Sequence, residues 1–184
     1  MLAVGETVGL LKAAILDVRF VNKLSQVADM AGDVHTKSLA NLLDYCFKNT
    51  SAKNIVTKSA DEVNEWWRVV QYYDNPPYTP GKTVLEFELS PSTKFVRVYD
   101  GVNSKMKGQW FMRAEEIVGL TPEQIQNKFS LPTTLKFIVD LELPAGTWIR
   151  GGETNPLFGF SGGGIQFDAM GQMLEGWSNA RSIV

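Results

Sequence analysis

The chain has 184 residues, of which 44% are hydrophobic and 21% are charged, and its formal net charge is −2. This balance is typical of one globular domain with a real core, and it excludes a strong overall attraction for nucleic acid or for an anionic membrane. A single cysteine, Cys46, excludes an intrachain disulfide and a cysteine-based metal site. No apolar run reaches the roughly 20 residues that span a bilayer. We therefore expect no bound metal and no membrane partner.

Residues 1–58 have the spacing of helices. Apolar residues recur three and four positions apart, as in the run from 10 to 18, and a break is predicted at residues 30–33. A further helix is predicted to begin at Ser59, which Glu62 follows three residues later in a capping-box pattern. We interpret residues 1–58 as a helical entry or delivery segment.

From residue 75 the pattern changes to that of extended structure. The stretch "NPPYTPG" ends the helix, and "TVLEFELS" and "KFVRVYDG" alternate apolar and polar residues as strands do. A helix is predicted to begin at Thr121, and further strands are predicted at 110–112, at 137–143, around Trp148 and, as the last strand, at "GIQFDAM". The predicted fold class is therefore α+β. It has a helical N-terminal segment followed by a small mixed or antiparallel β-sheet domain with flanking helices, and residues 59–184 form the catalytic domain.

The predicted catalytic domain contains no histidine and no cysteine, because the chain's one histidine is His35 and its one cysteine is Cys46. We interpret His35 as a helix-surface residue and Cys46 as a small core residue. Asp100 and Asp168 lie beside turns and are interpreted as structural. Any chemistry in residues 59–184 must therefore use charged, hydroxyl or amide side chains.

Five side chains remain as candidates for binding. Arg97 lies in a short strand and must either extend to solvent or face a cleft. Trp110 and Phe111 offer planar faces for stacking a base, although core packing also explains them. Arg113 and Lys128 could hold phosphates or lie on a solvated surface.

A glycine triplet precedes the last predicted strand. Gly162, Gly163 and Gly164 fit either a hairpin connection that needs positive φ or a backbone that must approach a ligand closely. Gln166 follows, and on an alternating strand its side chain points away from those of Ile165 and Phe167. The amide therefore points either to solvent or into a cleft.

The stretches "KFVRVYDG", "GQWFM", "KFIVDLELPAGT" and "PLFGFSGGGIQFD" resemble the TNT domain, the necrotizing-toxin NAD glycohydrolase family found at the C-termini of bacterial polymorphic toxins. The resemblance covers residues 82–170 and is most specific at "FGFSGGGIQF". The matching residues are Arg97, Tyr99, Gly101, Gly108, Phe111, Leu131, Pro132, Leu143, Pro144, Gly146, Phe158, Gly159, Gly162, Gly163, Gly164, Gln166 and Phe167.

The resemblance implies that Gln166 is central to catalysis and that Arg97 is the arginine of the first family strand. Lys128 is the basic residue nearest to the position of a second family arginine, and Gly163 and Gly164 belong to the binding loop. The substrate would be NAD+ or NADP+, with no separate cofactor. The chain would be a contact-dependent growth inhibition toxin, secreted and delivered into the cytoplasm of a target bacterium, with a cognate immunity protein as its partner.

The residue types agree with this chemistry. Nicotinamide leaves the ribose as a neutral molecule, so its departure needs no general acid, and the transition state resembles an oxocarbenium ion. Such a reaction needs groups that hold the diphosphate, orient the ribose, stack the nicotinamide and admit one water. A domain without histidine can supply all of these.

Three alternatives stay open. A tRNA-cleaving toxin could use a basic stripe formed by Lys94, Arg97, Lys105, Lys107 and Arg113, although RNA cleavage normally needs an acid and a base. An ADP-ribosyltransferase would need a glutamate near the ribose, and Glu153 is the one close to the glycine triplet. A binding module without catalytic activity is the third.

Overall fold

The structure is a computed structural model that describes residues 34–47 and 52–183. The predicted helices and the break within residues 1–33 therefore lie outside the described residues. The described elements are α3 (Val34–Phe47), β1 (Ala52–Ser59), α4 (Ala60–Val70), β2 (Thr83–Leu89), β3 (Thr93–Tyr99), β4 (Trp110–Phe111), the 3-10 helix η1 (Ala114–Glu116), α5 (Pro122–Lys128), β5 (Phe137–Leu143), β6 (Trp148–Glu153), β7 (Ile165–Asp168) and β8 (Trp177–Ser182).

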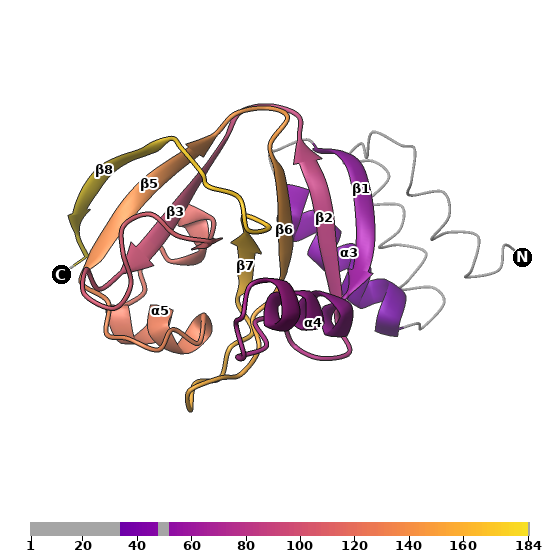
Figure 1. Cartoon of the computed structure of the whole chain (residues 1–184), viewed down its shortest axis with the longest axis horizontal. Coiled ribbons are helices and arrows are strands. Elements are labelled where there is room, and N and C mark those ends of the chain that lie inside the picture. Colours follow the sequence, from indigo (N-terminus) through magenta and orange to yellow (C-terminus); the bar gives the residue numbers. More distant parts are fainter. Residues whose placement is uncertain (1–33, 48–51, 184) are drawn as a thin grey trace, which may run out of the picture.

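The strands form two antiparallel sheets, which confirms the predicted α+β class (Figure 1). A five-stranded sheet has the order β1-β2-β6-β7-β4, and a three-stranded sheet has the order β3-β5-β8. An antiparallel bridge between Val96 and Met112 connects the strand β3 to the residue that follows β4. The two sheets therefore meet where β4 ends.

Helices cover both faces of the five-stranded sheet. Because side chains alternate along β2, Leu85 and Phe87 face α3 and join the main core with Leu43 and Phe47. Val84 faces the other way and packs with Trp67 of α4. In Figure 1 the two helices accordingly lie on opposite sides of the sheet.

Three sequence predictions about the elements are wrong. Residues 52–58 are not helical, because they form β1, which pairs with β2 from Ala52↔Leu89 to Ser59↔Thr83. The boundary after residue 58 is also misplaced, because β1 belongs to the five-stranded sheet and both α3 and β1 contribute to the main core. Finally, β7 is not the last strand, because β8 follows it and pairs with β5.

The predicted helix starts are confirmed in atomic detail. Thr121 caps α5 by accepting the backbone N–H of Gln124 while the Gln124 side chain accepts that of Thr121, and Pro122 is the first helical residue. Ser59 caps α4 by accepting the backbone N–H of Glu62, but the predicted capping box is not completed there, because the Glu62 carboxylate accepts from Lys58 Nζ at 2.9 Å. Local hydrogen bonding was therefore sufficient to locate these two helices.

Candidate functional site

The face of the five-stranded sheet under α4, called the α4 face below, carries a row of polar side chains. Gln166 lies opposite Gly152 on β6, and Asp168 lies between Arg150 on β6 and Trp110 on β4. Since side chains alternate along each strand, the side chains of Gln166, Asp168, Arg150 and Trp110 all project from this face. Two predicted site residues, Gln166 and Trp110, are thus brought together in adjacent rows.

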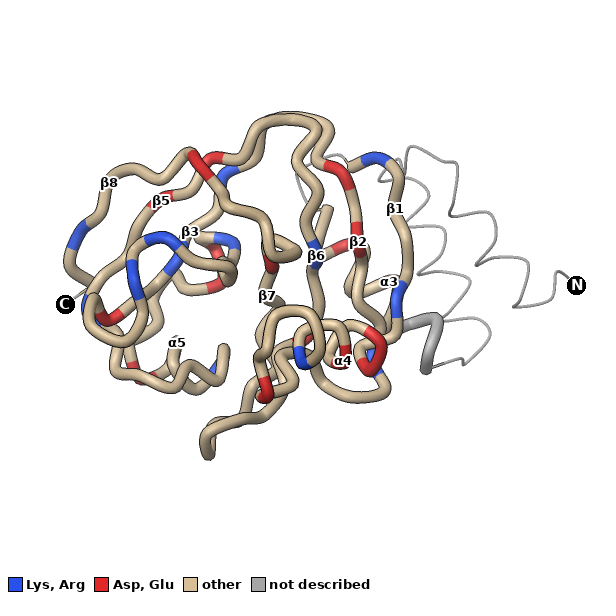
Figure 2. Tube along the Cα trace, viewed as in Figure 1, with Lys and Arg blue, Asp and Glu red and all other residues tan. Residues whose placement is uncertain are grey.

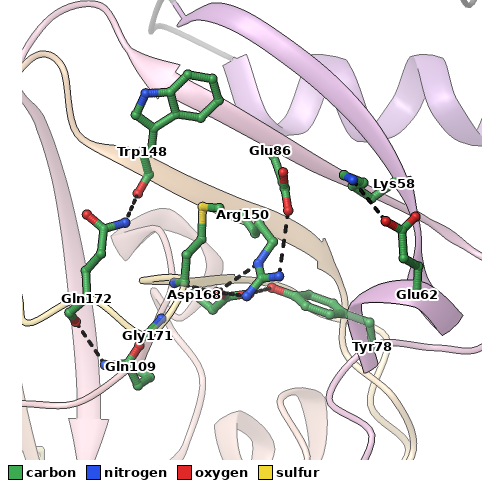
Figure 3. Close-up of polar contacts among 11 residues, drawn as sticks. Lys58, Glu62, Tyr78, Glu86, Gln109, Trp148, Arg150, Asp168, Gly171 and Gln172 are labelled. Atoms are coloured by element: carbon green, nitrogen blue, oxygen red, sulfur yellow. Dashed lines mark hydrogen bonds and ion pairs between the residues drawn. The ribbon is translucent and has the colours of Figure 1, made fainter. Parts of the chain in front are cut away.

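A buried hydrogen-bonded network occupies the centre of the α4 face (Figure 3). The hydroxyl of Tyr78 donates to Asp168 Oδ2 at 2.6 Å, and Arg150 Nε donates to Asp168 Oδ1 at 3.1 Å. The backbone N–H of Met170 donates to the same oxygen at 2.7 Å. Tyr78 and Asp168 have no exposed surface and Arg150 is only 2% exposed, so these donors compensate for the water that the carboxylate has lost.

Arg150 is held from several sides. Its guanidinium carbon lies 4.3 Å from the ring centroid of Trp66, and its Nη1 lies 3.7 Å from Glu86 Oε1. Its Nη2 lies 3.1 Å from Asp168 Oδ1 but is not aligned for a hydrogen bond. Trp66 therefore covers a cation that is stabilised by two carboxylates and a ring face.

Burial dominates the titration of this network. It raises the pKa of the Asp168 carboxyl, although Arg150, the Tyr78 hydroxyl and the Met170 N–H act in the opposite direction. Burial, together with the charge of Asp168, raises the pKa of Tyr78 well above its ordinary value. Tyr78 is therefore a hydrogen-bond donor, and it stays protonated at every physiological pH.

Residues 76–79, called the strap below, cross the end of the α4 face. The side chain of Asn64 on α4 pairs with the backbone of Tyr78, donating to its carbonyl at 2.8 Å and accepting its N–H at 3.0 Å. Asn155 donates its side-chain amide to the carbonyl of Pro76 at 2.9 Å and its backbone N–H to that of Pro77 at 3.0 Å. The strap is therefore fixed to both α4 and the segment after β6.

Gln166 points beneath the strap. Its Nε2 donates to the carbonyl of Pro77 at 3.1 Å, and the residue is 5% exposed. The side chain therefore does not point to solvent, and it is buried against the strap. The amide is a partner of the strap in this structure, and its carbonyl oxygen is the end that is available for other contacts.

Trp110 belongs to a group of aromatic rings beside the network. Its ring centroid lies 4.6 Å from that of Trp67 and 6.2 Å from those of Tyr73 and Tyr78. Trp110 is half-buried, so it both packs against the core and keeps part of its indole accessible. A planar ligand can stack only where such a partly exposed ring exists.

Arg97 is buried beside Trp110. Its Nη1 donates to the carbonyl of Trp110 at 2.8 Å and its Nε donates to that of Lys105 at 3.1 Å. A side chain at Gly108 would overlap the Arg97 guanidinium, which explains the glycine at that position. Burial lowers the pKa of Arg97 to about 10, and the residue is 9% exposed. Arg97 therefore holds the loop between β3 and β4 in place.

Phe111 and Arg113 lie in the core, so neither meets the α4 face. Phe111 has no exposed surface. Arg113 donates to the carbonyl of Cys46, and its guanidinium lies 5.8 Å from the ring of Phe95. The core-packing interpretation of Phe111 fits this placement, whereas the solvated-surface interpretation of Arg113 does not.

The glycine triplet approaches protein backbone. The N–H groups of Gly162 and Gly164 donate to the carbonyls of Asn127 and Lys128 at 3.0 Å each, and that of Gly163 donates to Thr154 at 2.9 Å. Gly162 and Gly163 have φ of 63° and 87°, and a Cβ at Gly164 would lie 2.8 Å from the Phe129 ring. The triplet thus docks the loop onto the end of α5, and these amides are already paired.

Lys128 lies with this docked loop and not with Gln166. Its Nζ is 2.6 Å from Glu116 Oε2 and donates to the backbone carbonyl of the same residue at 3.1 Å. The predicted site residues are consequently divided among the α4 face, the core and the end of α5.

Sequence reasoning missed Tyr78, Arg150 and Asn64 altogether and interpreted Asp168 as a structural residue beside a turn. The pairing of β6 with β7 brings Arg150 opposite Asp168, and the strap places Tyr78 over both. The one sequence signal was an arginine inside an apolar strand, at "WIRGG".

Comparisons with protein-family models, curated proteins and solved structures found no match. Within the described ranges, no group of histidine, cysteine, aspartate and glutamate side chains has an arrangement that could hold a metal ion. No helix of residues 34–47 or 52–183 is long and apolar enough to cross a membrane. We therefore infer a function from the arrangement of residues on the α4 face.

We expect Asp168→Asn to lower the free energy of unfolding by about 3 kcal/mol, because it leaves the buried Arg150 without its closest counter-charge. Asp140→Asn is the matched control, because Asp140 pairs with Arg181 at the surface. The Arg181 side chain is 43% exposed and the Asp140 side chain is 38% exposed. That control should cost less than about 1 kcal/mol. Urea unfolding measures both, and equal losses would contradict a stabilising role for the network.

Proposed function

We propose that the chain is an NAD(P)+ glycohydrolase, a toxin that breaks the bond between nicotinamide and ribose. The observation that carries the proposal is the juxtaposition of the Gln166 amide and the Trp110 indole in adjacent rows of the α4 face. An amide that orients a hydroxyl or a water, beside a partly exposed ring that stacks a base, is the set of groups that this reaction needs.

The chemistry follows from what these groups can do. Nicotinamide is a good leaving group, so the protein has to orient the ribose and stabilise positive charge that develops on it. The carbonyl oxygen of Gln166 can accept a hydrogen bond from a ribose hydroxyl or from the attacking water. Trp110 can stack on the departing ring, and Glu86, whose side chain is 17% exposed, adds negative charge to the same face.

Arg97 is the proposed contact for the diphosphate. Its two hydrogen bonds to backbone carbonyls use Nε and Nη1, and the second of them reaches Trp110 itself. The guanidinium is therefore bound to the backbone of the residue whose ring would stack the nicotinamide. Lys128 pairs with Glu116 and Arg113 donates to the carbonyl of Cys46, both away from the α4 face, so neither is part of the proposed site.

The two enzymatic alternatives are less well supported by the structure. The proposed basic stripe is interrupted, because Arg97 and Arg113 are buried and Lys107 pairs with Glu175 at 3.0 Å. Figure 2 shows acidic positions interspersed with basic ones along the trace. Glu153 lies opposite Ile165, on the side of the sheet away from Gln166, and lines a cavity of about 450 Å³ with Tyr45 and Lys82. An ADP-ribosyltransferase would need this carboxylate beside the ribose.

The resemblance to toxin domains extends the proposal to the setting of the reaction. The chain would be secreted and would act in the cytoplasm of a target bacterium, where it consumes NAD+ or NADP+. A producing cell would then need a cognate immunity protein that blocks the α4 face.

We expect the purified chain to release nicotinamide from NAD+ or NADP+ and to leave total tRNA intact. The variant with Lys94, Lys105 and Lys107 all changed to Gln should keep its nicotinamide release within about twofold, because in a glycohydrolase these side chains do not share a polyanion. Liquid chromatography of the nucleotides and gel electrophoresis of the tRNA are the measurements. Cleavage of tRNA that this triple variant abolishes, with NAD+ and NADP+ untouched, would replace the proposal by the nuclease alternative.

A further inference from the structure

The strap offers Gln166 only an acceptor. Pro77 has no backbone N–H, and its carbonyl accepts from Gln166 Nε2 at 3.1 Å and from the backbone N–H of Asn155 at 3.0 Å. A flipped amide would bring two carbonyl oxygens together, which is repulsive. The carbonyl of Pro77 therefore selects one of the two orientations of the Gln166 amide.

Tyr78 determines where that carbonyl lies. Its hydroxyl donates to the buried Asp168 at 2.6 Å, and its backbone is paired in both directions with the Asn64 side chain. Its ring packs against Gly152, where a Cβ would lie 2.8 Å from the ring carbon Cδ1. Because Gly152 is also the residue opposite Gln166, the ring and the amide occupy the same part of the face.

We infer that Tyr78 is a positioning residue for Gln166. Acting through the carbonyl of Pro77, it holds the amide nitrogen toward the strap and the amide oxygen toward the substrate. Arg150 and the Met170 N–H support this arrangement, since they fix the carboxylate to which Tyr78 donates. The inference rests on the proposed function for the substrate and for the effect on turnover, whereas the orientation of the amide rests on the hydrogen bonds alone.

The orientation has a consequence for the residue type at position 166. A carboxylate has no hydrogen to donate to Pro77, so glutamate of the same length cannot make the contact. The site accordingly requires an amide, which donates to the strap and accepts from the substrate with one side chain.

The test uses Tyr78→Phe, which removes the hydroxyl and keeps the ring. We expect kcat for nicotinamide release to fall about tenfold to a hundredfold with KM within about threefold, because a misoriented amide fails mainly in the transition state. Nuclear magnetic resonance of the full chain should show a coupling across the hydrogen bond from Gln166 Nε2 to the Pro77 carbonyl carbon, and Tyr78→Phe should lose it. Tyr99→Phe is the matched control, a buried tyrosine stacked on Phe137 at 5.3 Å in the other sheet.

Two results would overturn the inference. One is a wild-type chain without the coupling between Gln166 and Pro77, a measurement that needs no variant and no substrate. The other is a folded Tyr78→Phe with the kcat and the Gln166 signals of Tyr99→Phe. A wild-type chain that cleaves neither NAD+ nor NADP+ contradicts the proposed function instead, and the coupling then still decides the orientation of Gln166.

Discussion

Replacement of Gln166 by alanine should reduce the turnover of NAD+ by about a hundredfold or more, because it removes the amide proposed to orient the ribose or the water on the α4 face. The cost in stability should be about 1–2 kcal/mol, because one buried hydrogen bond to the Pro77 carbonyl is lost while the bond from Asn155 remains. Steady-state kinetics and thermal unfolding together separate the two effects.

Gln126 provides the matched control. It also donates its side-chain amide to a backbone carbonyl, that of Leu131 at 3.0 Å, but it lies on α5. Gln126→Ala should therefore lose a similar amount of stability and keep full turnover. If Gln166→Ala retains turnover within about threefold of the parent chain, Gln166 is not the catalytic group and the proposed site is wrong.

A fragment of residues 59–184 should not fold, which reverses the expectation that residues 1–58 serve delivery alone. The deletion removes β1 and the apolar face of α3, whose buried side chains Leu42, Leu43, Cys46, Phe47 and Ile55 belong to the main core. At roughly 2 kcal/mol for each buried side chain, their loss is comparable to the whole stability of a typical domain. Circular dichroism and the dispersion of amide resonances measure the outcome.

The full chain, prepared in parallel, is the reference for this deletion. Leu43→Ala in the full chain is the graded variant, since Leu43 has no exposed surface and its truncation should cost about 2–5 kcal/mol without abolishing the fold. A cooperative thermal transition in the 59–184 fragment would show that these residues fold independently of α3 and β1.

Sequence reasoning succeeded where the structure is determined by near neighbours. The caps at Ser59 and Thr121 and the alternation in β2 involve residues within a few positions of one another, so the pattern predicts them. It failed at β1, because "AKNIVTKS" lacks a clear period, and its strand state comes from pairing with β2.

Only part of the candidate site could be predicted, because its other residues are brought together by long-range contacts. Gln166 was singled out through the glycine motif, and Trp110 was singled out because its planar ring could stack a base. Tyr78, Arg150 and Asp168 contribute through contacts that join positions 18 and 90 residues apart. The glycine triplet was misleading, because two of its glycines do have positive φ, but its backbone approaches the end of α5, which neither sequence interpretation considered.

The strand order of the five-stranded sheet determines how the chain can acquire its fold. β2 has β1 on one side, but its other neighbour, β6, ends only at Glu153, after the whole of β3, β4 and β5 has intervened. Contacts between such distant positions form only after a large loop has closed, so the entropy of the loop is lost before the contacts stabilise the structure. This order makes folding slow. A nascent chain that has not yet reached β6 therefore exposes the unpaired edge of β2, and the first complete sheet forms only when nearly the entire sequence is available.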